Sequence, residues 1–170
     1  MKKLIFALTA IAAFLIAPNT THADSTSPMT PEQWLASPNM THADGTPDFA
    51  GTLKAAKQGK ASAQYNLGRM YDDGEGVAKD YTKAVYWYTK AAEQGVANAQ
   101  DNLGCKYDKG QGVAKDMVLA YAWFNLAAIN SENAVKNRDI VEHNLDPAGI
   151  NEGQRLASNW EIGQSIKREQ

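Results

Sequence analysis

The chain carries one dense group of side chains that could bind a cation, the carboxylates Asp72, Asp73, Glu75 and Asp80. Their spacing does not fit the alternating Asp-x-Asp-x-Asp-Gly pattern that places oxygen ligands around Ca²⁺ in calcium-binding loops. Two of the four are also missing from an equivalent segment 36 residues later, where lysine and glutamine replace them. We therefore interpret the segment as a turn and expect no metal site.

The three histidines and the single cysteine suggest no catalytic pair. His22, His42 and His143 lie in unrelated segments, and neither Gly-x-Ser-x-Gly nor His-Glu-x-x-His occurs. His143 is expected to be an exposed residue near a helix end. One thiol, Cys105, cannot close an internal disulfide, so it is either a small helix residue without a role or a site for an intermolecular bridge. The sequence predicts no catalytic residue and no cofactor, and therefore no enzyme.

The N-terminus has the three-part layout of a secretory signal peptide. Two lysines precede an apolar run of 14 residues, Leu4 to Ala17, and a polar segment follows that ends at Ala23. The run is shorter than the ~20 residues that cross a bilayer, so cleavage after Ala23 is predicted, with an uncleaved anchor or a buried helix as the alternatives. We expect an exported protein, located in the periplasm of a Gram-negative bacterium or secreted, with no transmembrane segment after processing.

The charge of the processed chain excludes one class of partner. Removal of the two signal-peptide lysines from the 17 basic residues leaves 15 against 19 acidic ones, a formal charge of -4. Nucleic-acid-binding domains instead concentrate basic residues on one face. We therefore expect no nucleic-acid partner.

An internal repeat of 36 residues organises the rest of the chain. When 61–96 is placed over 97–132, 18 of the 36 positions are identical. Whole strings return in phase, among them Gly-x-Gly-Val-Ala-Lys-Asp, which begins at Gly74 and again at Gly110. A degenerate copy at 46–60 precedes the two clear ones. Such a period is typical of solenoids, in which each unit buries its apolar face against the next.

Each clear copy is predicted to form two helices. In the first copy Ala63, Leu67 and Tyr71 recur every four residues, which places them on one helical face. Gly74 then ends that helix, because glycine tolerates the positive φ of a helix exit, and Asp80 can cap the next one. The second helix should bury one stripe, with Trp87 and its counterpart Trp123 in like surroundings.

The ends of the array are expected to be capping segments. A linker at 24–45 contains Thr30-Pro31-Glu32-Gln33, a sequence that favours the start of a short helix. The segment 133–168 should form two closing helices, the first capped by Ser131 and the second starting at Asp146-Pro147. With these the array would contain four helix pairs.

The string Ala-x-Ala-Gln-x-x-Leu-Gly-x-x-Tyr-x-x-Gly-x-Gly-Val-x-x-Asp-x-x-x-Ala-x-x-Trp, found at 61–87 and again at 97–123, resembles the Sel-one-like repeat (SLR), a relative of the tetratricopeptide repeat. The resemblance covers about 54–160 and implies an all-α solenoid of stacked antiparallel helix pairs with a right-handed superhelix. It also implies protein–protein binding. Some exported members carry one disulfide per repeat, a pattern from which this chain departs, and a few are linked to penicillin binding or β-lactam hydrolysis, for which we find no residue set.

In tetratricopeptide-like arrays the first helix of each pair lines a concave groove. The residues turned away from the buried face form a stripe that could contact an extended peptide. We predict the following partner-binding stripe: Ser62, Tyr65, Arg69, Asp72 and Asp73 in the first copy, and Asn98, Asp101, Cys105, Asp108 and Lys109 in the second. A plain solvated face is an equal alternative. Arg69 and Asp72 should form a helical i, i+3 pair.

The expected function is binding of a protein or peptide by a monomeric, exported module. The alternatives are an enzyme or accessory factor that acts on envelope material, through peptidoglycan or β-lactam hydrolysis, and a chaperone-like envelope component.

Overall fold

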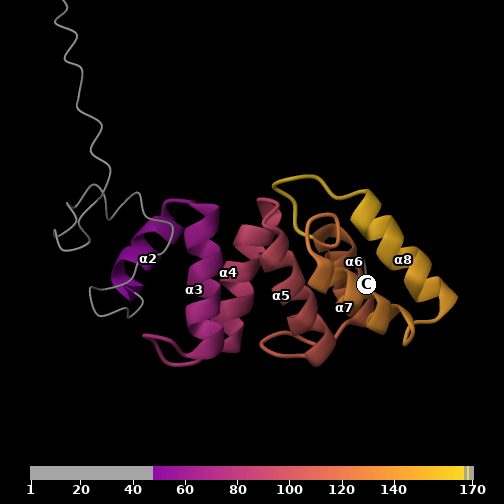
Figure 1. Ribbon diagram of the computed structural model, residues 1–170, viewed down its shortest axis with the longest axis horizontal. Helices are drawn as coiled ribbons and strands as arrows, with labels where there is room; N and C mark the ends of the chain where they lie inside the picture. The colour runs from indigo at the N-terminus through magenta and orange to yellow at the C-terminus, as the bar shows by residue number, and fades with distance from the viewer. Residues whose placement is uncertain (1–47, 167, 169–170) are drawn as a thin grey trace, which may run out of the picture.

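The computed structural model describes residues 48–166 and 168. This part contains seven helices and no strand: α2 (Phe49–Lys57), α3 (Ala61–Asp73), α4 (Tyr81–Glu93), α5 (Ala97–Lys109), α6 (Met117–Ala127), α7 (Glu132–Glu142) and α8 (Pro147–Ser158). They follow one another along an elongated array (Figure 1). The predicted all-α repeat solenoid is confirmed. The predicted signal peptide and the capping helix at Thr30 lie outside the described residues.

The array is built from two equivalent hairpins. Helix α3 packs against α4, and α5 packs against α6, while contacts between α4 and α5 join one hairpin to the next. The single helix α2 packs on α3 at the N-terminal end of the described chain. None of the helices in 48–166 is both long enough and apolar enough to cross a bilayer.

The turn inside each hairpin is the same in both copies. Gly74 and Gly110 end α3 and α5 with φ of 79° and 65°, a left-handed conformation that favours glycine. The amide of Asp80 then donates to the carbonyl of Tyr71 at 2.8 Å, and its carboxylate accepts from the amide of Lys83 at 3.0 Å. This carboxylate is the predicted cap of the next helix, and the backbone bond lowers its pKa. Asp116 caps α6 in the same way.

A glutamine and a glycine that recur in both copies explain how closely neighbouring helices pack. The buried side chain of Gln64 donates to the carbonyl of Ala56 at the end of α2, and that of Gln100 donates to Ala92 at the end of α4, each at 3.2 Å. A side-chain amide thus satisfies a helix-end carbonyl that would otherwise lack a partner. At Gly68 an added Cβ would lie 2.5 Å from the Tyr88 ring, so only glycine allows this approach.

Two expectations need correction. The closing helices do not form a fourth pair, because α7 and α8 each pack mainly against α6. The two tryptophans also differ. Trp123 is 1% exposed, whereas Trp87 is only partly buried against the same core cluster. Where a further repeat would follow α6, the described chain has α7 and α8. These helices bury more of α6 than the neighbours of α4 bury of α4.

Candidate interaction surface

The predicted stripe on α3 divides into an exposed spine and a partly buried flank. Ser62, Arg69 and Asp73 are exposed, while Tyr65 and Asp72 are partly buried. Arg69 forms its ion pair with Asp73, at 3.5 Å and four residues away, and not with Asp72 as expected. Both side chains of this pair are 47% exposed, so water screens it and a partner could replace either side.

Asp72 belongs to a contact between the two hairpins. One carboxylate oxygen accepts from the ammonium of Lys106 on α5, and the other accepts from the hydroxyl of Tyr88 on α4 at 3.2 Å. Burial and the nearby Asp72 charge raise the pKa of Tyr88 well above its usual value, so the hydroxyl remains a donor. Asp72 therefore joins three helices.

Lys106 is the residue that sequence reasoning missed. Its side chain is 8% exposed, and its ammonium also donates to Gln111 at 3.2 Å and lies 4.6 Å from the centre of the Tyr81 ring. A buried lysine requires such partners, because desolvation of its charge is costly. One signal was available: the equivalent residue in the first copy is Met70, which is buried, so a lysine stands where the repeat places an apolar side chain.

The equivalent stripe on α5 is more covered. Asn98 and Lys109 are exposed, but Asp101, Cys105 and Asp108 are partly buried. Helix α7 lies against this face. Its Asn137 donates to Asp101 at 2.9 Å and approaches the Cys105 sulfur at 3.8 Å. On α3 the structure thus leaves an exposed spine of Ser62, Arg69 and Asp73. On α5 only the two ends of the stripe, Asn98 and Lys109, are exposed.

Cys105 is a free thiol in a partly apolar setting. Burial raises its pKa, and the neighbouring Asp101 adds to the shift. Because the thiolate is the reactive form, a raised pKa lowers its reactivity near neutral pH. The structure favours the interpretation of Cys105 as a packing residue over that of a reactive thiol.

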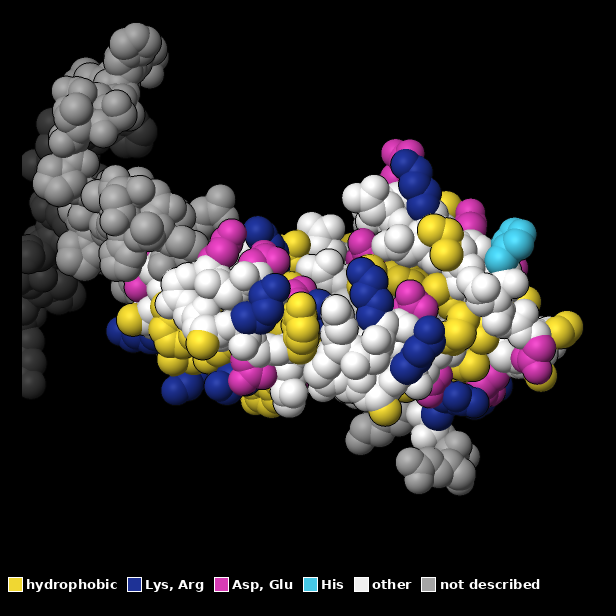
Figure 2. All heavy atoms as spheres, turned by 90° about the horizontal axis from the view of Figure 1, so that it is seen from below, with side chains coloured by type: hydrophobic (Ala, Val, Ile, Leu, Met, Phe, Trp, Pro, Cys, Tyr) yellow, Lys and Arg dark blue, Asp and Glu magenta, His cyan; other side chains and the backbone are white. Residues whose placement is uncertain are grey.

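His143 is exposed at the C-terminal end of α7, as expected. With Asp139, Glu142 and Ile150 it lines a shallow hollow of about 460 Å³ between α7 and α8. Over the face drawn in Figure 2, basic and acidic side chains are interspersed and no large field of one sign appears. Mixed charge of this kind gives electrostatic complementarity only over short stretches of a partner.

Comparison with known proteins identifies the repeats. The Sel1 repeat model matches residues 61–96 and 97–131. A protective antigen of uropathogenic Escherichia coli strains, which displays an SLR fold, is 39% identical with a TM-score of 0.64. The match covers 66% of this chain but only 24% of the antigen. A Sel1 repeat protein from Oxalobacter formigenes is 45% identical with a TM-score of 0.52, over 53% of this chain and 68% of that one. No curated protein matches the sequence.

Sel1 repeats generally form binding folds without catalysis, and they typically mediate protein–protein interaction. The matched segments coincide with the two hairpins whose turns, caps and buried glutamines are described above. The chain therefore belongs to the Sel1 repeat family.

Proposed function

We propose that this protein is an exported binding module that holds a protein or peptide segment along the α3–α5 face, without catalysis. The observation that carries the proposal is the contrast between the two copies. On α3 and α5 four buried positions carry the same residue, Ala63, Gln64, Leu67 and Gly68 in the first copy, whereas the exposed spine changes, from Ser62, Arg69 and Asp73 to the pair Asn98 and Lys109. A constant framework with a variable surface is expected when packing fixes the first and a partner selects the second.

The chemistry of the spine suggests a segment with charges of both signs. Arg69 can form a bidentate contact with a carboxylate, and Lys109 offers a second cation one repeat away. Asp73 can accept from a basic residue of the partner. Asp72 is excluded from this surface, because both of its oxygens are held by Lys106 and Tyr88.

Site-specific photocrosslinking in the native cells tests the binding face. A photoreactive residue at Ser62, Arg69 or Asn98 should capture one stoichiometric partner. The same residue at Lys136 on α7, whose side chain is 67% exposed, serves as the control and should not capture it. Equal capture from both faces would contradict the proposal, and many unfolded clients in place of one partner would indicate the chaperone-like alternative.

Substitution separates binding from folding. Arg69→Ala should change the free energy of unfolding by less than about 0.5 kcal/mol, because the site is exposed. It should still weaken capture of the crosslinked partner. A loss of stability like that of a core substitution would show that Arg69 is structural.

Export is the second part of the proposal, supported by the apolar run from Leu4 to Ala17 and the small residue Ala23. Fractionation of native cells followed by N-terminal sequencing should find the protein outside the cytoplasm, with Asp24 as its first residue. A cytoplasmic protein that retains Met1 would contradict this part and leave the binding face untouched.

A further inference from the structure

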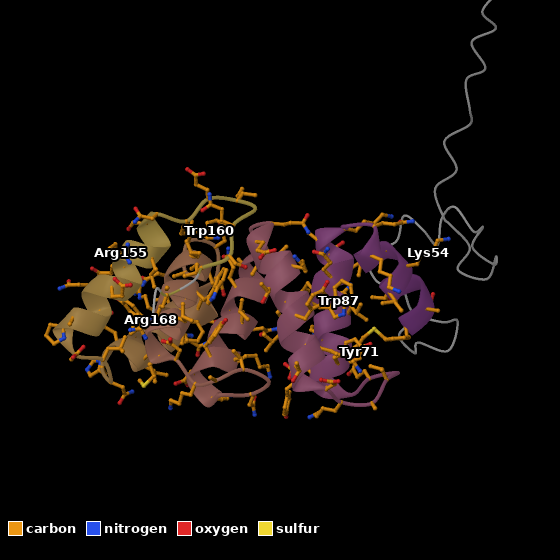
Figure 3. All side chains as sticks on the ribbon, turned by 180° about the vertical axis from the view of Figure 1, so that it is seen from behind. Lys54, Tyr71, Trp87, Arg155, Trp160 and Arg168 are labelled. Atoms are coloured by element: carbon orange, nitrogen blue, oxygen red, sulfur yellow. The ribbon has the colours of Figure 1, made fainter. Side chains whose placement is uncertain are left out.

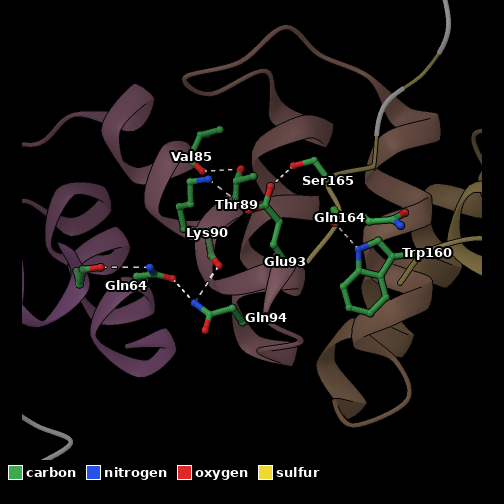
Figure 4. A network of polar contacts seen from close by, with 10 residues as sticks. Gln64, Val85, Thr89, Lys90, Glu93, Gln94, Trp160, Gln164 and Ser165 are labelled. Atoms are coloured by element: carbon green, nitrogen blue, oxygen red, sulfur yellow. Dashed lines mark hydrogen bonds and ion pairs between the residues drawn. The ribbon is translucent and has the colours of Figure 1, made fainter. Parts of the chain in front are cut away.

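The C-terminal residues 163–166 and Arg168 lie against α4 and α6. The Gly163 amide donates to the carbonyl of Glu93 at 2.7 Å. The Ser165 hydroxyl donates to the Glu93 carboxylate (Figure 4). Arg168 pairs with Asp116, the cap of α6, at 3.1 Å. These residues thus contact the end of α4 at Glu93 and the start of α6 at Asp116.

An aliphatic side chain fixes the middle of this segment. Ile166 is 7% exposed and belongs to the core cluster that contains Leu119 and Trp123 of α6. Leu126, the next residue on this face, packs on the same cluster. The outer side of α6 thus accepts an added segment, with one aliphatic residue in the core cluster and polar contacts at Glu93 and Asp116.

One repeat earlier the same positions are open. The counterparts of Leu119, Trp123 and Leu126 are Lys83, Trp87 and Lys90 on α4. The Lys83 side chain is 59% exposed, and Trp87 is only partly buried and lies edge-on to the exposed ring of Tyr86 at 5.0 Å. Figure 3 shows Trp87 toward the α2 end of the array, away from Trp160 and Arg168.

The side chains around Trp87 carry more positive charge than the side chains at the equivalent positions around Trp123. Lys83 and Lys90 replace the two leucines, and the exposed Lys57 at the end of α2 stands where Glu93 ends α4. Lys83 pairs with Asp80 at 3.0 Å and lies 5.3 Å from the centre of the Tyr71 ring, and Lys90 pairs with Glu93 at 3.5 Å. The two carboxylates are partly buried, but the lysine side chains are 59% and 45% exposed, so water screens the pairs and the ammonium groups can also contact a partner.

We propose that Lys57, Lys83, Trp87 and Lys90 form a second docking strip, which binds an extended segment of a partner protein that carries an aliphatic residue between acidic ones. The aliphatic residue packs on Trp87 as Ile166 packs in the Trp123 cluster, and the carboxylates contact the lysines. Tryptophan is frequent at the centre of such contacts. The strip involves α2 and α4, so it is separate from the α3–α5 face proposed above.

Binding of labelled peptides to the processed full-length chain tests the strip. The probe is the peptide Asp-Glu-Gly-Ser-Ile-Glu-Asp, with a second peptide in which serine replaces isoleucine and a third with the sequence of residues 160–170. The first should bind, with an affinity that falls as salt rises, and the serine peptide should bind at least tenfold more weakly. Equal binding of the serine peptide would overturn the proposal, and so would tighter binding of the 160–170 peptide, because that result would make a second copy of this chain the occupant.

Variants locate the site. Trp87→Ala should weaken the first peptide about tenfold or more, and Lys83→Glu with Lys90→Glu should do the same without removal of any buried group. Thermal melts followed by circular dichroism establish that each variant is folded. Lys136→Glu on α7, whose side chain is 67% exposed, is the matched control and should leave the affinity unchanged. Unchanged affinity in the lysine double variant would overturn the strip, while an effect of Arg69→Ala alone would move the peptide to the α3–α5 face.

Discussion

Helix α4 buries four of its 13 residues, whereas its counterpart α6 buries eight of its 11. The two helices occupy the same place in the repeat, and the side that faces their own hairpin is packed alike, with Gly68 against Tyr88 and Gly104 against Phe124. The difference lies on the other sides of α6, where α7, α8 and Ile166 are added. A repeat motif therefore fixes the inner packing of a helix, and its neighbours in the array decide how much of the outside is covered.

Truncation of the two tryptophans should give the largest difference in stability between α4 and α6. Trp123→Ala should cost about 3–5 kcal/mol, because it empties a fully buried site. Trp87→Ala should cost about 1–2 kcal/mol, since part of that ring is already in water. Urea unfolding measures both. Leu67→Ala and Leu103→Ala provide the control, because both leucines are fully buried and should each cost about 2–5 kcal/mol. Equal costs for the tryptophans would show that their surroundings are alike after all.

Removal of the C-terminal cover should make α6 resemble α4. A chain that ends at Gln164 loses the buried Ile166, worth about 1.5–3 kcal/mol, and the more exposed pair of Arg168 with Asp116, worth little. The Trp123 ring should then be open to solvent from that side. Iodide quenching of a variant in which Trp34, Trp87 and Trp160 are replaced by phenylalanine, compared with and without the truncation, reports this change at Trp123 alone. Quenching and stability that do not change would contradict the inference that Ile166 helps to cover Trp123.

The contact between the hairpins can be broken at Lys106. Lys106→Ala should cost about 1–3 kcal/mol, because it leaves the Asp72 carboxylate without its buried cation. Lys106→Met combined with Asp72→Asn should recover most of this loss, since methionine is what the first copy carries and the amide oxygen can still accept from Tyr88. Urea unfolding of Lys106→Met, Asp72→Asn and the double variant gives the coupling energy. Additive losses would mean that the pair does not link the hairpins.

The smallest expected effect concerns how fast a thiol reacts on the α3 stripe and on the α5 stripe. Cys105 should react slowly with iodoacetamide at pH 8, because burial raises its pKa and reduces the thiolate fraction. The reaction should accelerate as the pH rises toward that pKa. Arg69→Cys in a Cys105→Ser background places a thiol at the equivalent, open position, and it should react faster while stability changes by less than about 0.5 kcal/mol. Similar rates would show that α7 does not cover the α5 stripe.

The helices, their turns and their caps were predictable because local residues set them. Gly74 and Gly110 end helices, Asp80 and Asp116 start them, and Ser131 and Asp146 do the same for α7 and α8. The predicted surface was right in the exposure of Ser62 and Arg69 but not in the pairing of Arg69 or the openness of Cys105. Those features depend on which helix lies next to a face, and helix periodicity carries no information about that.

The sequence by itself determined the repeat and the hairpin within it, because a 36-residue period of small, aromatic and capping residues can satisfy its backbone and bury its apolar face only by stacking. The tertiary structure decided the rest. It placed α7 over the α5 stripe, paired Lys106 with Asp72, and laid Ile166 in the core cluster of Trp123 while Trp87 stayed partly open. These outcomes follow from contacts between residues up to 72 positions apart, such as Ser165 with Glu93.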